Sequence, residues 1–146
     1  MKNNNQNFSV SDVVVSPSHN EIESKGKVIR LQPQVMAVFY YLALHRERVI
    51  GNEELIENVW RGRVVTHSSV QKSINYLRKA LVELIGENQL IAHYSKQGYQ
   101  LQGVPVFFDA ETKSDGDSGW LKFLPWPVNS YLVLALSIIF TASLGF

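Results

Sequence analysis

Residues 68–84 read SSVQKSINYLRKALVEL, and this stretch decides the fold. Its apolar residues recur three or four positions apart, which is the spacing of one face of an α-helix. They are Val70, Ile74, Leu77, Leu81 and Leu84. Thr66 or Ser68 can cap the start of this helix, and residues 86–88 end it. The pattern therefore predicts a long helix that buries one stripe against a core.

The other side of this predicted helix is polar. At 100° per residue, six side chains share one exposed face. They are Ser68, Ser69, Lys72, Asn75, Tyr76 and Lys79. Hydroxyl, amide, phenol and ammonium groups are the types that reach base edges and phosphates in a major groove of DNA. We therefore predict DNA contact through this face.

Local charge supports the same prediction. The whole chain has a net charge of only +1, with 14 Lys plus Arg against 13 Asp plus Glu. Between Glu57 and Glu83, however, there is no acidic residue. The basic residues in that interval are Arg61, Arg63, Lys72, Arg78 and Lys79. An ordinary solvated helix face would mix Glu with Lys, so the imbalance favours a polyanionic partner. We predict that Arg78 also contacts DNA, and that Arg61 and Arg63 contact either phosphate or a protein partner.

The residues before this helix predict a sheet followed by two helices. Residues 8–10 and 12–15 are short β-prone stretches, residues 19–24 carry one apolar residue, and a turn at residues 25–27 leads into Val28, Ile29 and Leu31. Together they indicate a small antiparallel sheet. Pro33 can begin a first helix that extends to about His45. Gly51 or Asn52 can cap a second, short helix whose apolar residues include Leu55 and Trp60.

A hairpin is predicted after the long helix. Residues 90–94 and 99–101 are strand-like and are joined by the tight connection Ser95, Lys96, Gln97 and Gly98, in which Gly98 can supply a positive φ. Lys96 at the tip can reach a phosphate or the minor groove. The predicted order is therefore sheet, three helices and hairpin, an α+β domain over residues 8–104.

The two ends of the chain differ from this domain. Residues 1–7 are a polar tract that we expect to be disordered, and residues 105–124 have the composition of a linker.

Residues 131–146, YLVLALSIIFTASLGF, carry no charge. A helix from Val128 would be roughly 28 Å long, close to the roughly 30 Å of a bilayer core. We predict a transmembrane helix over residues 125–146, the alternative being a buried helix of a soluble protein.

These motifs together resemble the OmpR/PhoB-type winged-helix DNA-binding domain. The similarity covers roughly residues 8–103 and rests on four segments in matching order: LQPQVM at residues 31–36, VIGNEEL at 49–55, SINYLRKAL at 73–81, and Gly98-Tyr99. It implies a winged helix-turn-helix in which the long helix is the recognition helix and residues 95–98 are the wing. It also implies that the loop carrying Arg61 and Arg63 corresponds to a segment through which relatives contact RNA polymerase.

The arrangement of domain and span is similar to that of the ToxR/CadC group of one-component regulators. That resemblance implies an activator of promoter DNA in the bacterial inner membrane, single-pass, with its N-terminal domain in the cytoplasm and with tandem copies on DNA. Relatives usually carry a periplasmic sensor after the span. We therefore expect either a truncated chain or a short regulator that depends on a second membrane protein for its signal.

Two departures from the family pattern are visible. Gly51 stands where a capping Ser is common, and Lys96 stands where the wing commonly has Gly. The first is expected to weaken the second helix slightly, and the second to alter the wing.

Other function classes have little support in the sequence. There is no cysteine, and the four histidines are scattered without metal-ligand spacing, so we expect no metal or other cofactor. No set of nucleophile, base and orienting group is present, and we expect no enzymatic activity. The alternative that stays open is an interaction module, in which the domain binds another regulator and the span holds the complex at the membrane lipid.

Overall fold

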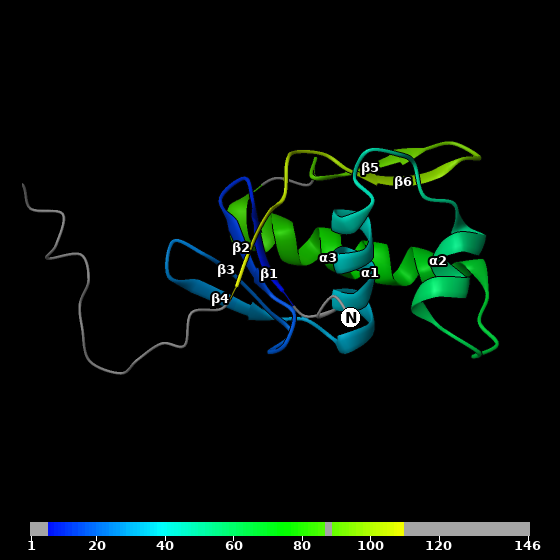
Figure 1. Ribbon diagram of the computed structural model, residues 1–146, viewed down its shortest axis with the longest axis horizontal. Helices are drawn as coiled ribbons and strands as arrows, with labels where there is room; N and C mark the ends of the chain where they lie inside the picture. Colours follow the sequence, from blue (N-terminus) through cyan, green and yellow to red (C-terminus); the bar gives the residue numbers. More distant parts are fainter. Residues whose placement is uncertain (1–5, 87–88, 110–146) are drawn as a thin grey trace, which may run out of the picture. The chain divides into compact units, whose positions relative to one another are not determined.

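The computed structural model describes residues 6–86 and 89–109, and Figure 1 shows their arrangement. The elements in chain order are β1 (Asn7–Val10), β2 (Val13–Ser16), β3 (Glu21–Ser24), β4 (Lys27–Arg30), α1 (Pro33–Leu44), α2 (Asn52–Val59), α3 (His67–Ile85), β5 (Ile91–Tyr94), β6 (Gly98–Leu101) and β7 (Val106–Phe108). The predicted α+β order of sheet, three helices and hairpin is confirmed.

The N-terminal sheet is antiparallel throughout, in the strand order β4-β3-β2-β1-β7. One face is apolar and buried, because side chains alternate along each strand. Phe8, Val15 and Ile22 follow one another across three neighbouring strands and are fully buried. On the opposite face Val14 and Glu23 are exposed. The sheet therefore contributes one layer of a core whose other layer is helical.

Helix α1 is central to that core. Its buried side chains are Val35, Met36, Val38, Phe39, Leu42 and Ala43. They cover one broad side of the helix, and α1 packs against both α2 and α3. Phe39 meets Phe8 of β1 edge to face, with ring centroids 5.3 Å apart. The helix begins at Pro33. The first backbone N–H groups of a helix have no intrahelical acceptor, so the lack of an N–H in proline costs no hydrogen bond there.

Strand β7 corrects two of the predicted boundaries. It lies in the range assigned to a linker from residue 105 onward, yet it pairs with β1 in the register Asn7↔Phe108, Phe8↔Phe107 and Ser9↔Val106. The Phe107 ring lies 5.3 Å from that of Phe8. Asn7, placed in the disordered N-terminus, is the first residue of β1. The folded unit therefore includes Asn7 and extends to Phe108.

The predicted transmembrane helix at residues 125–146 lies outside the described residues, as does the linker from residue 110 onward. Within residues 6–86 and 89–109, no helix combines the length and the apolar character needed to cross a bilayer.

A charged cluster joins the end of α1 to α2. Glu54 accepts hydrogen bonds from the Tyr41 hydroxyl at 2.8 Å and from Arg48 Nη1 at 2.7 Å, and Arg48 Nη2 is also within bonding reach of it. The Tyr41 ring lies against His45, with centroids 4.5 Å apart. Chiefly because Arg48 donates to the carboxylate, the pKa of Glu54 falls from 4.5 to about 2.

This cluster predicts a pH dependence of stability. Since the folded-state pKa of Glu54 is depressed, its stabilising effect is present above pH 4.5 and is lost as the pH falls towards 2. Glu54→Gln should lower the free energy of unfolding by about 1–2 kcal/mol at neutral pH, with a smaller loss in high salt because Arg48 is half exposed. Urea unfolding at a series of pH values should show the two proteins converging on acidification.

Glu57→Gln is the matched control, because Glu57 is on the same helix, is exposed and has no ion-pair or hydrogen-bond partner within the described residues. A gap between the wild type and Glu54→Gln that stayed constant down to pH 2 would contradict the assignment.

Candidate nucleic-acid interface

Helix α3 packs into the core through the apolar stripe that was predicted from the sequence. Val70, Ile74, Leu77 and Leu81 are buried, and Ser73 and Ala80 are buried beside them. The helix begins after Thr66, which has the extended backbone of an N-cap residue, and Gly86 ends it in the left-handed conformation at φ 77°. Both predicted end signals are confirmed. The Thr66 side chain makes no cap bond; its hydroxyl lies 2.6 Å from that of Ser68.

The opposite side of α3 is open to solvent. Ser68, Lys72, Asn75, Tyr76 and Lys79 are exposed, and Ser69 is half-buried. Tyr76 is notable because 57% of this large side chain is exposed. The predicted face therefore exists as one continuous arc of the helix, and we name these six residues the polar face. Glu53 of α2 approaches the start of α3, where its carboxylate lies 3.2 Å from His67 outside the polar face.

Arg78 differs from the other predicted contacts. Its Nη2 donates a hydrogen bond of 2.8 Å to the carbonyl oxygen of Ile91 in β5. Its guanidinium carbon also lies 5.9 Å from the ring centroid of Tyr99 in β6, within cation–π range. Arg78 thus ties α3 to the hairpin. The sequence signal could not reveal this role, because the partners come from strands whose position against α3 is set by tertiary packing.

Strands β5 and β6 form the predicted wing. They pair antiparallel from Ile91↔Leu101 to Tyr94↔Gly98, and the turn residues Ser95, Lys96 and Gln97 are exposed. Lys96 has φ 61°, in the left-handed region where Gly costs less than other residues. This conformation gives a physical reason for the Gly that is common at this position in the family.

The wing is also attached to the connection between α1 and α2. Ile50 and Tyr99 exchange two backbone hydrogen bonds, at 2.8 and 2.9 Å. Gly98 lies directly against this bridge with φ 136°, and a Cβ there would stand 1.9 Å from the carbonyl oxygen of Ile50. The positive φ predicted for Gly98 is confirmed. The close backbone approach is a second, independent requirement for glycine that the sequence did not indicate.

Gly51 sits beside the same bridge, as the N-cap of α2. It has extended backbone angles and makes no side-chain cap bond, and its neighbour Glu53 is in the first turn of the helix. A Cβ at Gly51 would be 3.6 Å from the carbonyl oxygen of Gln97, an ordinary contact. The departure from the family's Ser at this position therefore has no steric cause in this structure.

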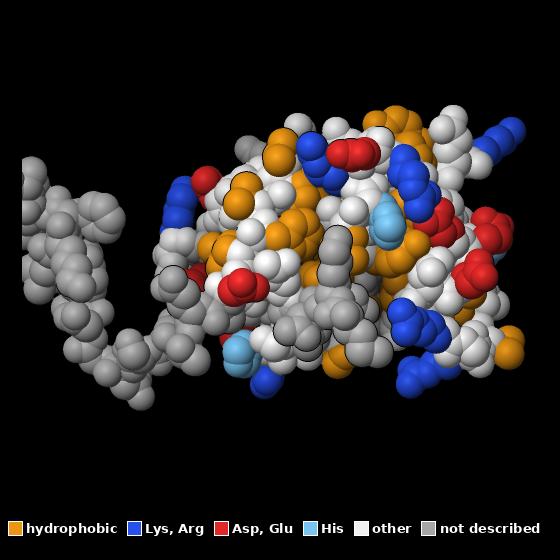
Figure 2. All heavy atoms as spheres, in the orientation of Figure 1, with side chains coloured by type: hydrophobic (Ala, Val, Ile, Leu, Met, Phe, Trp, Pro, Cys, Tyr) orange, Lys and Arg blue, Asp and Glu red, His pale blue; other side chains and the backbone are white. Residues whose placement is uncertain are grey.

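The loop between α2 and α3 presents the remaining predicted residues. Arg61 and Arg63 are exposed on either side of Gly62, which has φ 74°, and Val64 is fully exposed. Trp60 just before them is buried, as expected for a core residue. Figure 2 shows basic side chains at the end of the domain that carries this loop and the wing, with acidic side chains between them on that face.

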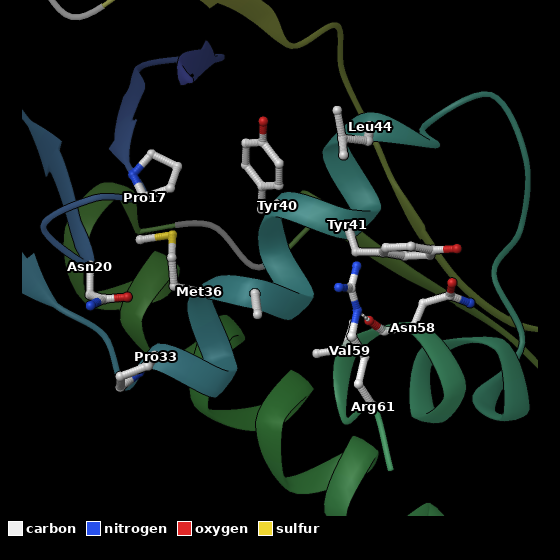
Figure 3. Close-up of a pocket in the computed structure, with 11 residues that line it drawn as sticks. Pro17, Asn20, Pro33, Met36, Tyr40, Tyr41, Leu44, Asn58, Val59 and Arg61 are labelled. Carbon is white, nitrogen blue, oxygen red and sulfur yellow. Dashed lines mark hydrogen bonds between the residues drawn. The ribbon is translucent and has the colours of Figure 1, made fainter. Parts of the chain in front are cut away.

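Arg61 also borders a groove of about 370 Å³ along α1 (Figure 3). Its Nε donates to the carbonyl oxygen of Asn58 at 3.3 Å, and it shares the groove wall with Val59 at the end of α2. Residues of α1 line the other wall, among them the buried Met36 and the half-buried Tyr41. The groove holds no cluster of titratable groups, and across residues 6–86 and 89–109 no group of His, Asp and Glu side chains could hold a metal ion.

The described part of the chain thus combines the polar face of α3, the wing and the exposed loop with Arg61 and Arg63, which we name the basic loop. A family model described as "Transcriptional regulatory protein, C terminal" matches residues 26–101. The chain belongs to this family. The resemblance to OmpR/PhoB-type domains is thereby confirmed.

Two activators of this family are similar in sequence. The transcriptional activator CadC of Escherichia coli strain K12 is 35% identical over 107 residues, which are 73% of this chain and 21% of CadC. The cholera toxin transcriptional activator of Vibrio cholerae is 29% identical over 111 residues, which are 75% of this chain and 38% of that protein. The matched region is thus well under half of either activator.

A solved structure agrees with this assignment. The DNA-binding domain of E. coli CadC is 32% identical, superposes with a TM-score of 0.66, and is matched over 97% of its length by 70% of this chain. The chain is therefore homologous to the DNA-binding domains of transcriptional regulators, and the winged-helix part of the predicted fold is confirmed.

Proposed function

We propose that the chain is a membrane-anchored, sequence-specific DNA-binding regulator that activates transcription. The observation that carries the proposal is the polar face of α3, which is exposed and contains no carboxylate, beside a wing that presents Lys96. In nucleic-acid recognition, backbone contacts fix the position of the protein and base contacts provide specificity.

The side chains of the polar face divide into these two roles. Lys72 and Lys79 carry positive charge and would bind phosphates. Asn75 has an amide that can form paired hydrogen bonds with adenine, and Tyr76 adjoins it with a hydroxyl and a ring that can contact base edges. Ser68 and Ser69 at the start of the helix would bind either partner. Arg78 would support the wing in addition to any phosphate it reaches.

The basic loop is proposed as a second contact. Arg61 and Arg63 flank an exposed Val64, a combination that fits a protein surface as well as a phosphate. Contact with RNA polymerase through this loop would explain how a DNA-bound domain activates transcription.

The anchor is proposed from residues 128–146, which carry no charge and would form a helix roughly 28 Å long, close to the roughly 30 Å of a bilayer core. The domain would then face the cytoplasm from the bacterial inner membrane, in contact with membrane lipid. A second membrane protein would supply the signal, and copies of the chain would bind promoter DNA in tandem.

The test is a gel-shift series on the full chain. A double-stranded sequence is first selected from a random pool by the wild type, and four variants are then compared on it and on random duplex. Lys72→Ala and Lys79→Ala should weaken binding on both duplexes and reduce the salt dependence by about one counterion each. Asn75→Ala and Tyr76→Ala should in addition lower the discrimination between the two duplexes, by about 1–3 kcal/mol.

Lys25→Ala is the matched control, since Lys25 is an exposed lysine in the β3–β4 turn and belongs to neither the polar face nor the wing. If all four variants bound like the wild type, the proposal would fail. Binding of a partner protein that did not respond to salt, with no selected duplex, would favour the interaction module instead.

A further inference from the structure

We infer that the DNA-binding surface extends beyond α3 onto the end of β4, where Arg30 and Gln32 form a phosphate-binding cleft with Tyr76 and Lys79. This inference rests on the proposed function and adds two residues from a different part of the chain. Strand β4 lies beside the C-terminal half of α3, and the cleft of about 280 Å³ lies between them.

The cleft has a polar rim and an apolar floor. Arg30 and Gln32 line it from β4 and the turn into α1, and Tyr76 and Lys79 line it from α3. All four side chains are exposed. The floor includes three buried residues, Leu31, Val35 and Ala80. A buried apolar floor with exposed cationic and hydrogen-bonding groups around it suits a charged group that stays at the surface.

The charge balance of the cleft is positive. Its one acidic lining residue, Glu83, is 3.2 Å from the ammonium of Lys27, which also donates to the carbonyl oxygen of Glu83 at 3.0 Å. Arg30 and Lys79 have no ion-pair partner in the described part of the chain. Glu21 faces Arg30 across the strand pair without an ion pair between them. Two unpaired cations therefore stand at the rim.

The position of the cleft relative to the wing indicates which ligand it fits. On α3, Arg78 contacts the wing and Ala80 lines the cleft, and two positions along a helix correspond to a rotation of about 200° around its axis. The polar face lies within this arc. A helix that occupies a major groove has a sugar-phosphate backbone on each side, roughly 12 Å apart. The wing would meet one backbone, and the cleft the other.

The chemistry of the rim fits a backbone phosphate. A guanidinium can donate two parallel hydrogen bonds to phosphate oxygens, an ammonium adds a point charge, and amide and phenol groups are common phosphate donors. None of these contacts depends on the base sequence. Arg30 should therefore contribute to affinity and to salt dependence, and not to sequence preference.

The test compares Arg30→Gln with the wild type in the full chain, using a random-sequence duplex and the duplex selected by the wild type. Arg30→Gln should lower affinity by the same factor on both. It should also make the fall in affinity between roughly 50 and 200 mM salt about 3.5-fold smaller, as expected for one lost counterion. Gln32→Ala should weaken binding slightly with an unchanged salt slope, because no charge is removed.

Two further variants make the result decisive. Arg30→Lys retains the charge and should retain the salt slope, while Lys25→Gln removes the same charge from the far end of the β3–β4 hairpin and should behave like the wild type. An unchanged salt slope in Arg30→Gln, with Lys72→Ala still reducing it, would overturn the cleft and leave the proposed function standing. A loss confined to binding of phosphatidylglycerol vesicles would also overturn the cleft, and a wild type that binds no duplex would overturn both proposals.

Discussion

Gly98→Ala is expected to lower the free energy of unfolding by about 3–5 kcal/mol and to detach the wing. A methyl group at this position would stand 1.9 Å from the carbonyl oxygen of Ile50, and the partners are backbone atoms that cannot rotate away. Relief of the clash requires that the bridge between Ile50 and Tyr99 break, with loss of two hydrogen bonds. The backbone angle of φ 136° adds strain for any residue with a side chain.

Thermal and urea unfolding of the full chain would measure the loss, and hydrogen exchange of the Tyr99 and Ile50 amides would localise it. Gly26→Ala is the matched control, because Gly26 has a positive φ of 80° but no atom within 4 Å of the place that a methyl group would take. It should cost only about 1–2 kcal/mol, the strain of the left-handed conformation. Equal losses in the two variants would show that close approach to Ile50 does not constrain the native state.

Phe8→Ala is expected to lower the free energy of unfolding by a similar amount, about 3–5 kcal/mol. Phe8 is fully buried, and its ring contacts Phe39 of α1 and Phe107 of β7, each with a centroid distance of 5.3 Å. The substitution would leave a cavity where the sheet, the central helix and the last strand meet. We expect protection of the β7 amides from hydrogen exchange to fall further than that of α3.

Phe108→Ala is the control for this experiment, because it removes an aromatic ring from the neighbouring position of β7, where 39% of the side chain is exposed. It should cost less than about 1.5 kcal/mol, in keeping with partial burial. A comparable loss for Phe108→Ala would mean that the strand is held by its outer face and not by Phe107 against the core.

The sequence predicted most of this fold because its signals are local. The stripe from Val70 to Leu81 repeats along one helix, and Pro33 and Gly86 act through their own backbone angles. Such features depend on residues a few positions apart. Exposure of Lys72, Asn75 and Lys79 followed from the same periodicity, since a residue opposite a buried stripe faces solvent.

What the sequence missed depends on contacts between distant residues. Strand β7 has three residues, too few for a periodic signal, and its pairing partner β1 is at the other end of the domain. The hydrogen bond from Arg78 to Ile91 and the close approach of Gly98 to Ile50 likewise depend on the position of the wing, which is set by tertiary packing and not by local sequence. A single arginine at the end of a strand is common, so Arg30 could be assigned no role before the structure placed α3 beside it.

The order of strands in the N-terminal sheet also determines where the rest of the protein is attached. β7 and β4 are the two edges, four strand spacings apart, or roughly 19 Å. The chain passes Asp109, whose carboxylate accepts a bond of 3.1 Å from Gln6, and so departs from the edge remote from Arg30. A pulling force applied through the later residues would therefore act first on β7, which is paired with β1 over three residues.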